Sequence, residues 1–156
     1  MRIRDYRPED AVAVSRLYEA SVRELGGRGY SAEQVAAWAG VTPTPENLDA
    51  RMADGRFRLL AVDEQGGLLA FVDAEPDGHI DFLYAAPEAA GKGAARAAYE
   101  AAEARLRVAG CERLFAEASE LARPFFERQG FSTTHRRDFE VGGVAIHNWA
   151  VEKRLP

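Results

Sequence analysis

The sequence predicts an α+β fold, and three observations indicate it. Helical periodicity dominates the first third of the chain, short strand-like runs joined by glycine turns begin at Phe57, and one alanine-rich helix separates these runs from a second group of strands. The chain has 156 residues, which is typical of one domain, and 47% of them are hydrophobic, which is enough to bury a core. We therefore expect a single domain over residues 1–156.

The first third of the chain is expected to form one short strand and three helices. Residues 1–6 alternate in the manner of a strand, and a helical pattern for which Asp10 is the expected cap follows directly. Ser31 and Gln34 have the spacing of a capping box at the start of a second helix. A third helix is expected within residues 44–55, with a proline in its first turn and a glycine at its end.

The remaining strands fall into two groups. Residues 56–87 contain three strand-like runs separated by the turn signals EQGG and EPDG, so an antiparallel meander is the simplest topology. After the alanine-rich helix, residues 111–119 form another short apolar run. A short helix over 120–130 and a final pair of strands over 131–141 and 144–155 complete the expected order.

Composition and charge exclude several classes of protein. Twenty lysines and arginines against 25 acidic residues give a net charge of −5, so the overall charge attracts neither nucleic acid nor an anionic membrane. The single cysteine, Cys111, cannot form an internal disulfide, and no group of cysteines and histidines has metal-ligand spacing. The N-terminus lacks the apolar core of a signal peptide, and no apolar run approaches the roughly 20 residues that span a bilayer. We expect a cytoplasmic protein that needs no metal.

The start of the alanine-rich helix has the character of an anion site. Gly91 and Gly93 flank Lys92 just before the helix, where backbone N–H groups lack intrahelical acceptors and the positive end of the helix dipole lies. Lys92 and Arg96 add positive charge. The alternative is that the two glycines only form a turn. The stretch GKG lacks the spacing of a P-loop, and the antiparallel strands before it do not suit a dinucleotide-binding fingerprint.

Two short motifs together indicate a family. The stretch AGKGAA, residues 90–95, matches the loop pattern (Q/R)xxGx(G/A) at Gly93 and Ala95. A second pattern, NxxAxxxYExxGF, is followed in register at Ser119, Ala122, Phe126, Glu127, Gly130 and Phe131. In this order the motifs resemble those of the GNAT superfamily of acyl-CoA-dependent N-acyltransferases. The stretch PFFE, residues 124–127, is similar to a subfamily in which it replaces the usual tyrosine motif.

The resemblance implies a mixed, mostly antiparallel, twisted sheet of about six or seven strands, splayed at its centre between the strands that end near Tyr84 and Ala118 and flanked by helices. It implies an N-acetyltransferase in which a primary amine of a small molecule or peptide attacks the thioester of acetyl-CoA directly, with no metal. The pantetheine arm would pair with a strand and the diphosphate would bind the helix start. The residues expected to bind acetyl-CoA are Leu83, Tyr84, Ala85, Ala90, Gly91, Lys92, Gly93, Ala94, Ala95, Arg96, Ser119 and Phe126.

Three positions depart from the family pattern. Ala90 stands where the family usually has Gln or Arg, and Ser119 replaces the usual Asn. Phe126 stands where a tyrosine commonly protonates the leaving thiolate, and a phenyl ring cannot donate a proton. These departures leave two alternatives open: an acyl-CoA-binding regulator or sensor with little turnover, and a nucleotide-binding module.

Three residues are candidates for the base that keeps the substrate amine neutral. Strand alternation places His79, Asp81 and Leu83 on one face, and Glu117 at the end of the next strand would face the same opening. We rank Asp81 first, Glu117 second and His79 third, with a solvated edge or an ion-pair partner as the alternative for each. Tyr84 is the candidate for the acid that replaces the family's tyrosine.

The acceptor end of the site carries the weakest sequence signal. The resemblance implies that the early helices wall the substrate pocket, which makes Tyr30 and Trp38 candidate lining residues, with plain core packing as the alternative. His147 in the last strand is a third candidate. Arg136 and Arg137 are followed by acidic residues, so a solvated strand face is expected for both. The last two strands could expose an edge that pairs two subunits into a homodimer.

Overall fold

The computed structural model describes the whole chain, residues 1–156, as a seven-stranded sheet with helices on both faces. The strand order is β1-β2-β3-β4-β5-β7-β6, and every neighbouring pair is antiparallel except β4 and β5, which are parallel. The strands are β1 (Arg2–Asp5), β2 (Phe57–Val62), β3 (Leu68–Ala74), β4 (His79–Ala85), β5 (Arg113–Ala118), β6 (Ser132–Val141) and β7 (Val144–Arg154). The predicted α+β class and the mostly antiparallel sheet are confirmed.

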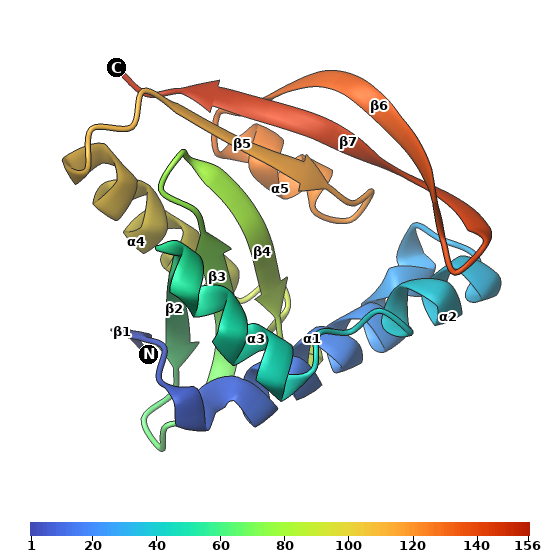
Figure 1. Cartoon of the computed structure of the whole chain (residues 1–156), viewed down its shortest axis with the longest axis horizontal. Coiled ribbons are helices and arrows are strands. Elements are labelled where there is room, and N and C mark those ends of the chain that lie inside the picture. The colour runs from blue at the N-terminus through green and yellow to red at the C-terminus, as the bar shows by residue number, and fades with distance from the viewer.

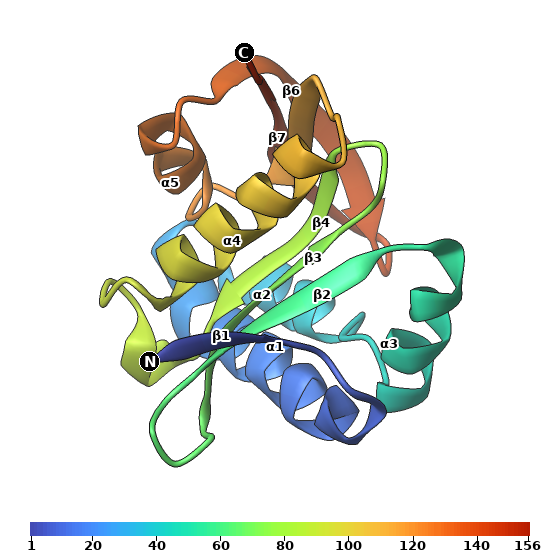
Figure 2. The same cartoon turned by 90° about the vertical axis from the view of Figure 1, so that its left-hand side faces the viewer.

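Five α-helices cover the sheet. They are α1 (Ala11–Leu25), α2 (Ala32–Ala39), α3 (Pro45–Arg51), α4 (Ala94–Val108) and α5 (Arg123–Arg128). Helix α4 packs on β2, β3 and β4 from one side, while α1 packs on β3 and β4 from the other (Figures 1 and 2). Helix α5 lies against β6 and β7, and α2 contacts β7. None of the helices combines the length and the apolar character that crossing a membrane would require.

The helix starts follow the local sequence signals. Ser31 Oγ accepts the backbone N–H of Gln34 at 3.1 Å and the Gln34 side chain accepts the N–H of Ser31 at 3.0 Å, so the predicted capping box is confirmed. Thr44 caps α3 with a single bond, in which its Oγ1 accepts the backbone N–H of Asn47 at 3.1 Å. Asp10 does precede α1, but its carboxylate accepts the backbone N–H of Arg7 and binds Arg4, because a 3-10 turn over Pro8–Asp10 comes before the helix.

The core lies between the sheet and its helices and contains a cluster of 29 buried residues. Helix α4 contributes Ala94, Ala98 and Ala102, none more than 2% exposed, together with the fully buried Tyr99. A row of alanines lets the helix axis approach the strands closely, because no long side chain separates them. This close approach fixes the start of α4 relative to the end of β4.

The sheet opens between β4 and β5. These strands share only two residue pairs, His79 with Phe115 and Ile80 with Ala116, and then diverge (Figure 1). At the closed end, Phe115 N–H donates to the Gly78 carbonyl at 3.1 Å, and a Cβ on Gly78 would lie 2.1 Å from the Arg113 carbonyl oxygen. The expected splay at the centre of the sheet is therefore present, and its closed end depends on a glycine.

A β-bulge changes the orientation of side chains along β4. The pairing of β3 with β4 shifts register at one point, where Asp81 is an extra residue in β4. Because paired residues share a face, the alternation is interrupted there and Leu83 lies on the face opposite His79. The expectation that His79, Asp81 and Leu83 share one face is therefore wrong for Leu83.

Candidate active site

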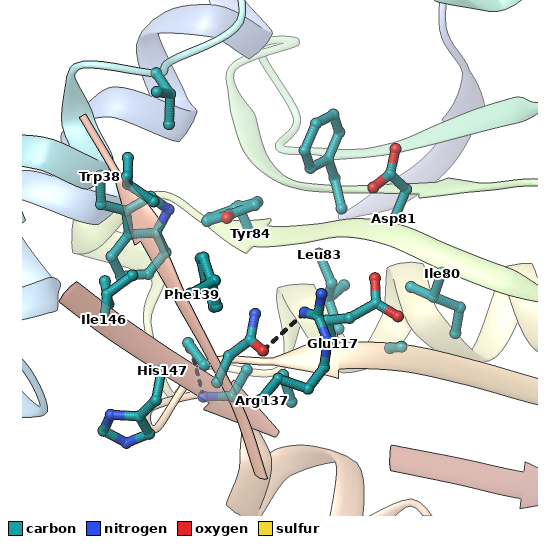
Figure 3. A pocket seen from close by; sticks show the side chains of 18 of the residues that line it. Trp38, Ile80, Asp81, Leu83, Tyr84, Glu117, Arg137, Phe139, Ile146 and His147 are labelled. Atoms are coloured by element: carbon teal, nitrogen blue, oxygen red, sulfur yellow. Dashed lines mark hydrogen bonds between the residues drawn. The ribbon is translucent and has the colours of Figure 1, made fainter. Parts of the chain in front are cut away.

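A cavity of about 300 Å³ occupies the opening between β4 and β5 (Figure 3). It is lined by 21 residues, of which 15 are hydrophobic, and these come from β4, β5, α1, α2, α5 and the hairpin of β6 and β7. The sequence-predicted site residues that line it are Tyr30, Trp38, Asp81, Leu83, Tyr84, Glu117, Ser119, Phe126 and His147. His79, Ala85 and the predicted residues from 90 to 96 do not line it.

The start of α4 presents a row of free backbone donors. Gly91 and Gly93 have φ values of 75° and 91°, a left-handed conformation that only glycine adopts readily, and α4 begins directly after them. The N–H groups of Gly91, Gly93, Ala94, Ala95 and Arg96 have no acceptor within the protein. The N–H groups of Ala90 and Lys92 differ, since they donate to the carbonyls of Pro87 and Ala89. A Cβ on either glycine would meet nothing within 4 Å, so the space before these donors is open.

The two cations at this helix start are placed differently. Arg96 is exposed and its Nε lies 2.8 Å from Glu100 Oε1 one turn along α4. Lys92 is also exposed and has no carboxylate within 4.0 Å. Of the two charged side chains beside the unpaired N–H groups, Lys92 is thus the one without an ion-pair partner.

One edge of β4 is unpaired along the opening. Leu83, Tyr84 and Ala85 pair with β3 on one side, whereas β5 stops pairing with β4 at Ile80. The backbone of residues 81–85 therefore has its other edge directed at the opening. An extended ligand can add to such an edge as an extra strand.

Glu117 and His79 form a hydrogen-bonded pair at the closed end of the opening. His79 Nε2 lies 2.7 Å from Glu117 Oε1, and His79 Nδ1 lies 2.7 Å from Glu75 Oε1. The bond to Glu117 and the second carboxylate raise the pKa of His79 to about 9, although burial acts in the opposite direction. The same bond to His79 lowers the pKa of Glu117. Glu117 reaches the cavity and His79 stands behind it, with its ring stacked on Phe115.

Asp81 is held by a nearly buried arginine. Its Oδ2 lies 2.9 Å from Arg56 Nη1, and the same guanidinium lies 2.8 Å from Asp73 and 2.8 Å from Asp54. Arg56 is only 7% exposed and remains charged at any physiological pH. Asp81 therefore faces a permanent cation, whereas the partner of Glu117 can titrate. Of the two carboxylates, Glu117 is therefore the one whose partner changes its charge with pH.

The hydroxyl groups of Ser119 and Tyr84 line the same cavity as Phe126. Phe126 is 3% exposed and packs against Phe131 with ring centroids 4.9 Å apart, so its position serves the core. Ser119 Oγ accepts the N–H of Ala122 at 3.1 Å, which leaves its own proton available. Burial raises the pKa of Tyr84 well above its usual value, so this phenol keeps its proton.

The part of the cavity around Tyr30 and His147, two residues expected at the acceptor end, is tied together by hydrogen bonds that sequence reasoning missed. Tyr30 donates to the His147 carbonyl at 2.9 Å and accepts the N–H of Glu120 at 3.0 Å. The Glu120 carboxylate binds His147 Nε2 and accepts the indole N–H of Trp149, and the bond to His147 lowers the pKa of Glu120. Trp38 donates to Tyr18 at 3.1 Å. No local pattern indicated Glu120, because its partners lie on other elements.

Arg137 was expected on a solvated strand face, and this expectation is wrong. It lines the cavity, and its Nη1 donates to Asn148 Oδ1 at 2.9 Å (Figure 3). Arg136 does lie outward and pairs with Asp138. The two arginines differ because successive strand residues point to opposite faces of the sheet. The face of β6 that carries Arg137 lies over the opening between β4 and β5.

Comparison with known proteins identifies the family. A sequence model described as "Acetyltransferase (GNAT) domain" matches residues 28–153, which is most of the chain. The chain belongs to the GNAT acetyltransferase family. As a GNAT protein it is an acyltransferase.

Individual relatives agree with this assignment. The uncharacterized N-acetyltransferase YafP of Escherichia coli K12 is 27% identical over 159 residues, covering 96% of this chain and 93% of YafP. A GCN5-related N-acetyltransferase from Rhodopseudomonas palustris, known from its crystal structure, is 31% identical in sequence to this chain. The two structures have a TM-score of 0.90 over 99% of this chain and 95% of that one. The PaiA N-acetyltransferase of Thermoplasma acidophilum, solved with coenzyme A, has a TM-score of 0.78 at 18% identity, over 99% of this chain and 98% of that one.

Proposed function

We propose that this GNAT protein moves an acetyl group from acetyl-CoA to the primary amine of a small molecule or peptide. The observation that carries the proposal is the combination of a cavity between β4 and β5, an unpaired β4 edge beside it and a row of unpaired N–H groups at the start of α4. The three features supply a place for a thioester, for an extended arm and for a diphosphate. We propose that residues 1–156 act as one domain in the cytoplasm.

The residues at the start of α4 suit the diphosphate of acetyl-CoA. Five backbone donors, from Gly91, Gly93, Ala94, Ala95 and Arg96, face open space at the positive end of a helix dipole. Lys92 adds a charge without an internal partner. The PaiA relative was solved with coenzyme A, which supports this donor. Acetyl-CoA supplies an activated acyl group, and the chain supplies orientation and proton transfer.

Glu117 and His79 are proposed to take the proton of the substrate ammonium. Glu117 meets the cavity, so its carboxylate can accept a hydrogen bond from the amine, and neutral His79 can hold the released proton between Glu117 and Glu75. Because the pKa of His79 lies at about 9, the neutral form grows as the pH rises toward 9. The amine itself becomes neutral in the same direction, so both requirements favour alkaline conditions.

The leaving thiolate needs a proton donor other than Phe126. The hydroxyls of Ser119 and Tyr84 both line the cavity and both hold a proton across the physiological range. We propose Ser119 as the donor, since its position matches the family motif and its oxygen is already fixed by the Ala122 N–H. Tyr84 is the second candidate.

The test is release of free CoA thiol from acetyl-CoA with a panel of primary amines. Wild-type protein is expected to turn over at least one amine, and Glu117→Gln is expected to reduce kcat with little change in affinity for CoA. CoA binding without turnover on any amine would favour the sensor alternative, which Ala90 and Phe126 motivate. Thermal stabilisation by ATP and not by CoA would contradict the proposal, because a ligand of the folded state must raise its stability.

The oligomeric state is proposed from the sheet edge. β6 is the last strand of the sheet, and nothing pairs with its outer edge over the ten residues Ser132–Val141. Exposed strand edges pair with other chains unless they are protected. We propose that two subunits associate through this edge, and a molar mass measured by light scattering that matches one chain would contradict it.

A further inference from the structure

Arg137 is a cation inside the cavity with no carboxylate partner. The structure contains no ion pair for its guanidinium within 4.0 Å, and its hydrogen-bonding partner is the neutral amide of Asn148. The ring of Phe139 lies 5.5 Å from the guanidinium carbon. A half-buried guanidinium with a neutral partner and aromatic surroundings keeps donors available for an anion.

Glu117 and Arg137 point to the same side of the sheet. Glu117 pairs with Ala150 and Arg137 pairs with Asn148, and these two partners are two residues apart on β7. Paired residues share a face and residues two apart share a face, so the carboxylate and the guanidinium enter the cavity from one side (Figure 3). The charge of Arg137 also helps to lower the pKa of Glu117.

An anion bound to Arg137 would belong to the acceptor and not to the diphosphate of acetyl-CoA. No residue from 91 to 96 lines the cavity, so the diphosphate donors lie elsewhere. The cavity that Arg137 enters also has an apolar wall, formed by Phe139 beside Arg137 and, further along, by Ile146 and Trp38. A ligand that places an ammonium at Glu117, an anion at Arg137 and an apolar group against this wall has the chemistry of an amino acid.

We propose that the acceptor is a free α-amino acid with an apolar side chain and that Arg137, oriented by Asn148, binds its carboxylate. The inference rests on the proposed function, because it names the acceptor of the same reaction. Asn148 accepts one N–H of the guanidinium, which leaves the others free for a two-point bond to a carboxylate. Arg137 then selects substrates by charge while Glu117 receives the amine.

The test compares leucine with leucinamide and isoamylamine, which keep the amine and the side chain but lack the carboxylate. Free CoA thiol is measured with wild-type protein, Arg137→Gln and Arg137→Lys. Arg137→Gln is expected to lower kcat/KM for leucine by about 10- to 100-fold and to change it less than about 3-fold for the two analogues that lack the carboxylate. The ratio of variant to wild type for each acceptor cancels the intrinsic reactivity of its amine. Arg137→Lys should retain part of the activity with leucine.

Arg136→Gln is the matched control, because the neighbouring arginine lies outward and pairs with Asp138 at 3.1 Å. It removes the same charge from the same strand and should leave all three acceptors unchanged. Equal losses with leucine and leucinamide in Arg137→Gln would overturn the inference. So would activity with succinyl-CoA that depends on Arg137, since the carboxylate would then belong to the acyl group.

Measurements of acceptor binding test this inference separately from the proposed function. Calorimetry with CoA present measures leucine and leucinamide independently of turnover. If wild-type protein binds leucine more tightly than leucinamide, and Arg137→Gln abolishes the difference, the inference stands even if no acetyl transfer is found and the proposed function fails. If wild-type protein transfers acetyl to amines but prefers the carboxylate in neither turnover nor binding, the inference is wrong and the proposed function stands.

Discussion

Replacing Glu75 by glutamine is expected to shift the pH dependence of catalysis through His79. The His79 ring lies 2.7 Å from both Glu117 and Glu75, and its pKa is raised to about 9. Glu117 contributes more than Glu75, while burial opposes both, so loss of the Glu75 charge should lower this pKa. With a pKa of about 9, about 3% of the ring is neutral at pH 7.5, and each pKa unit of lowering should raise this fraction and kcat/KM about 8-fold.

The assay is the pH profile of kcat/KM between pH 6 and 10. An amino acid amide serves as the acceptor for wild type and variant alike, so the titration of its amine is common to both profiles and the difference between them reports His79. A direct NMR titration of the His79 ring should give the same values. The other charges near the ring are Asp81 from β4, Arg137 from β6 and Arg56, and none of them is changed by this substitution. Glu64→Gln removes an equal charge from an exposed turn and should leave the profile unchanged.

The pH dependence of the unfolding free energy tests the contact between His79 and Glu75 independently of catalysis. Because the pKa of His79 is higher in the folded state than its ordinary value of 6.5, the charged ring stabilises the fold fully below pH 6.5, and this stabilisation is lost as the pH rises through about 9. The upper limit of the loss is about 3 kcal/mol, reduced by water around the half-exposed carboxylates. Between pH 6.5 and about pH 9, the unfolding free energy of the Glu75→Gln variant should fall less than that of wild type. A wild-type ring that titrates near 6.5, or a profile unmoved by Glu75→Gln, would refute the reasoning.

Three other substitutions test separate parts of the molecule. Glu117→Gln should lower kcat by about 10²- to 10⁴-fold while CoA affinity, measured by calorimetry, stays constant; an unchanged kcat would exclude a base at this position. Gly93→Ala strains a left-handed residue and should cost about 1–2 kcal/mol of stability and weaken CoA binding, whereas Gly66→Ala, equally left-handed but in the turn between β2 and β3, should show only the stability loss in thermal unfolding. Arg56→Met leaves the buried Asp73 with one cation and frees Asp81, so unfolding in urea should show a loss of about 2–4 kcal/mol, and a smaller loss would mean that Arg58 alone suffices.

Local patterns in the sequence were sufficient to predict the order of elements. Capping at Ser31, the glycine turns between strands and the alanine face of α4 are all decided by neighbours in the chain, and each is present in the structure. The family motifs were also local, which is why the splayed sheet could be expected. The free N–H groups before α4 follow from the two left-handed glycines and needed no tertiary information.

The site's side-chain partners could not be predicted in the same way. Asp81 on β4 binds Arg56, which directly precedes β2 on the other side of β3, and the bulge at Asp81 depends on pairing with β3. Arg137 was assigned to solvent because acidic residues follow it, but the long β6–β7 hairpin carries it over the end of β5. These contacts join residues far apart in the chain, so they depend on strand register, which periodicity alone does not specify.

The position at which the sheet opens coincides with a pair of acidic residues on the two parting strands. In the parallel register of β4 and β5, the pair that would follow Ile80 and Ala116 is Asp81 beside Glu117. Two carboxylates directly opposite each other disfavour pairing, and here each turns to its own cation, Asp81 to Arg56 and Glu117 to His79. The strands part at the position where this pair of like charges would form, which is also where Asp81 is the extra residue of the β-bulge. Both carboxylates line the cavity there, and each would gain an attraction from a substrate ammonium bound between them.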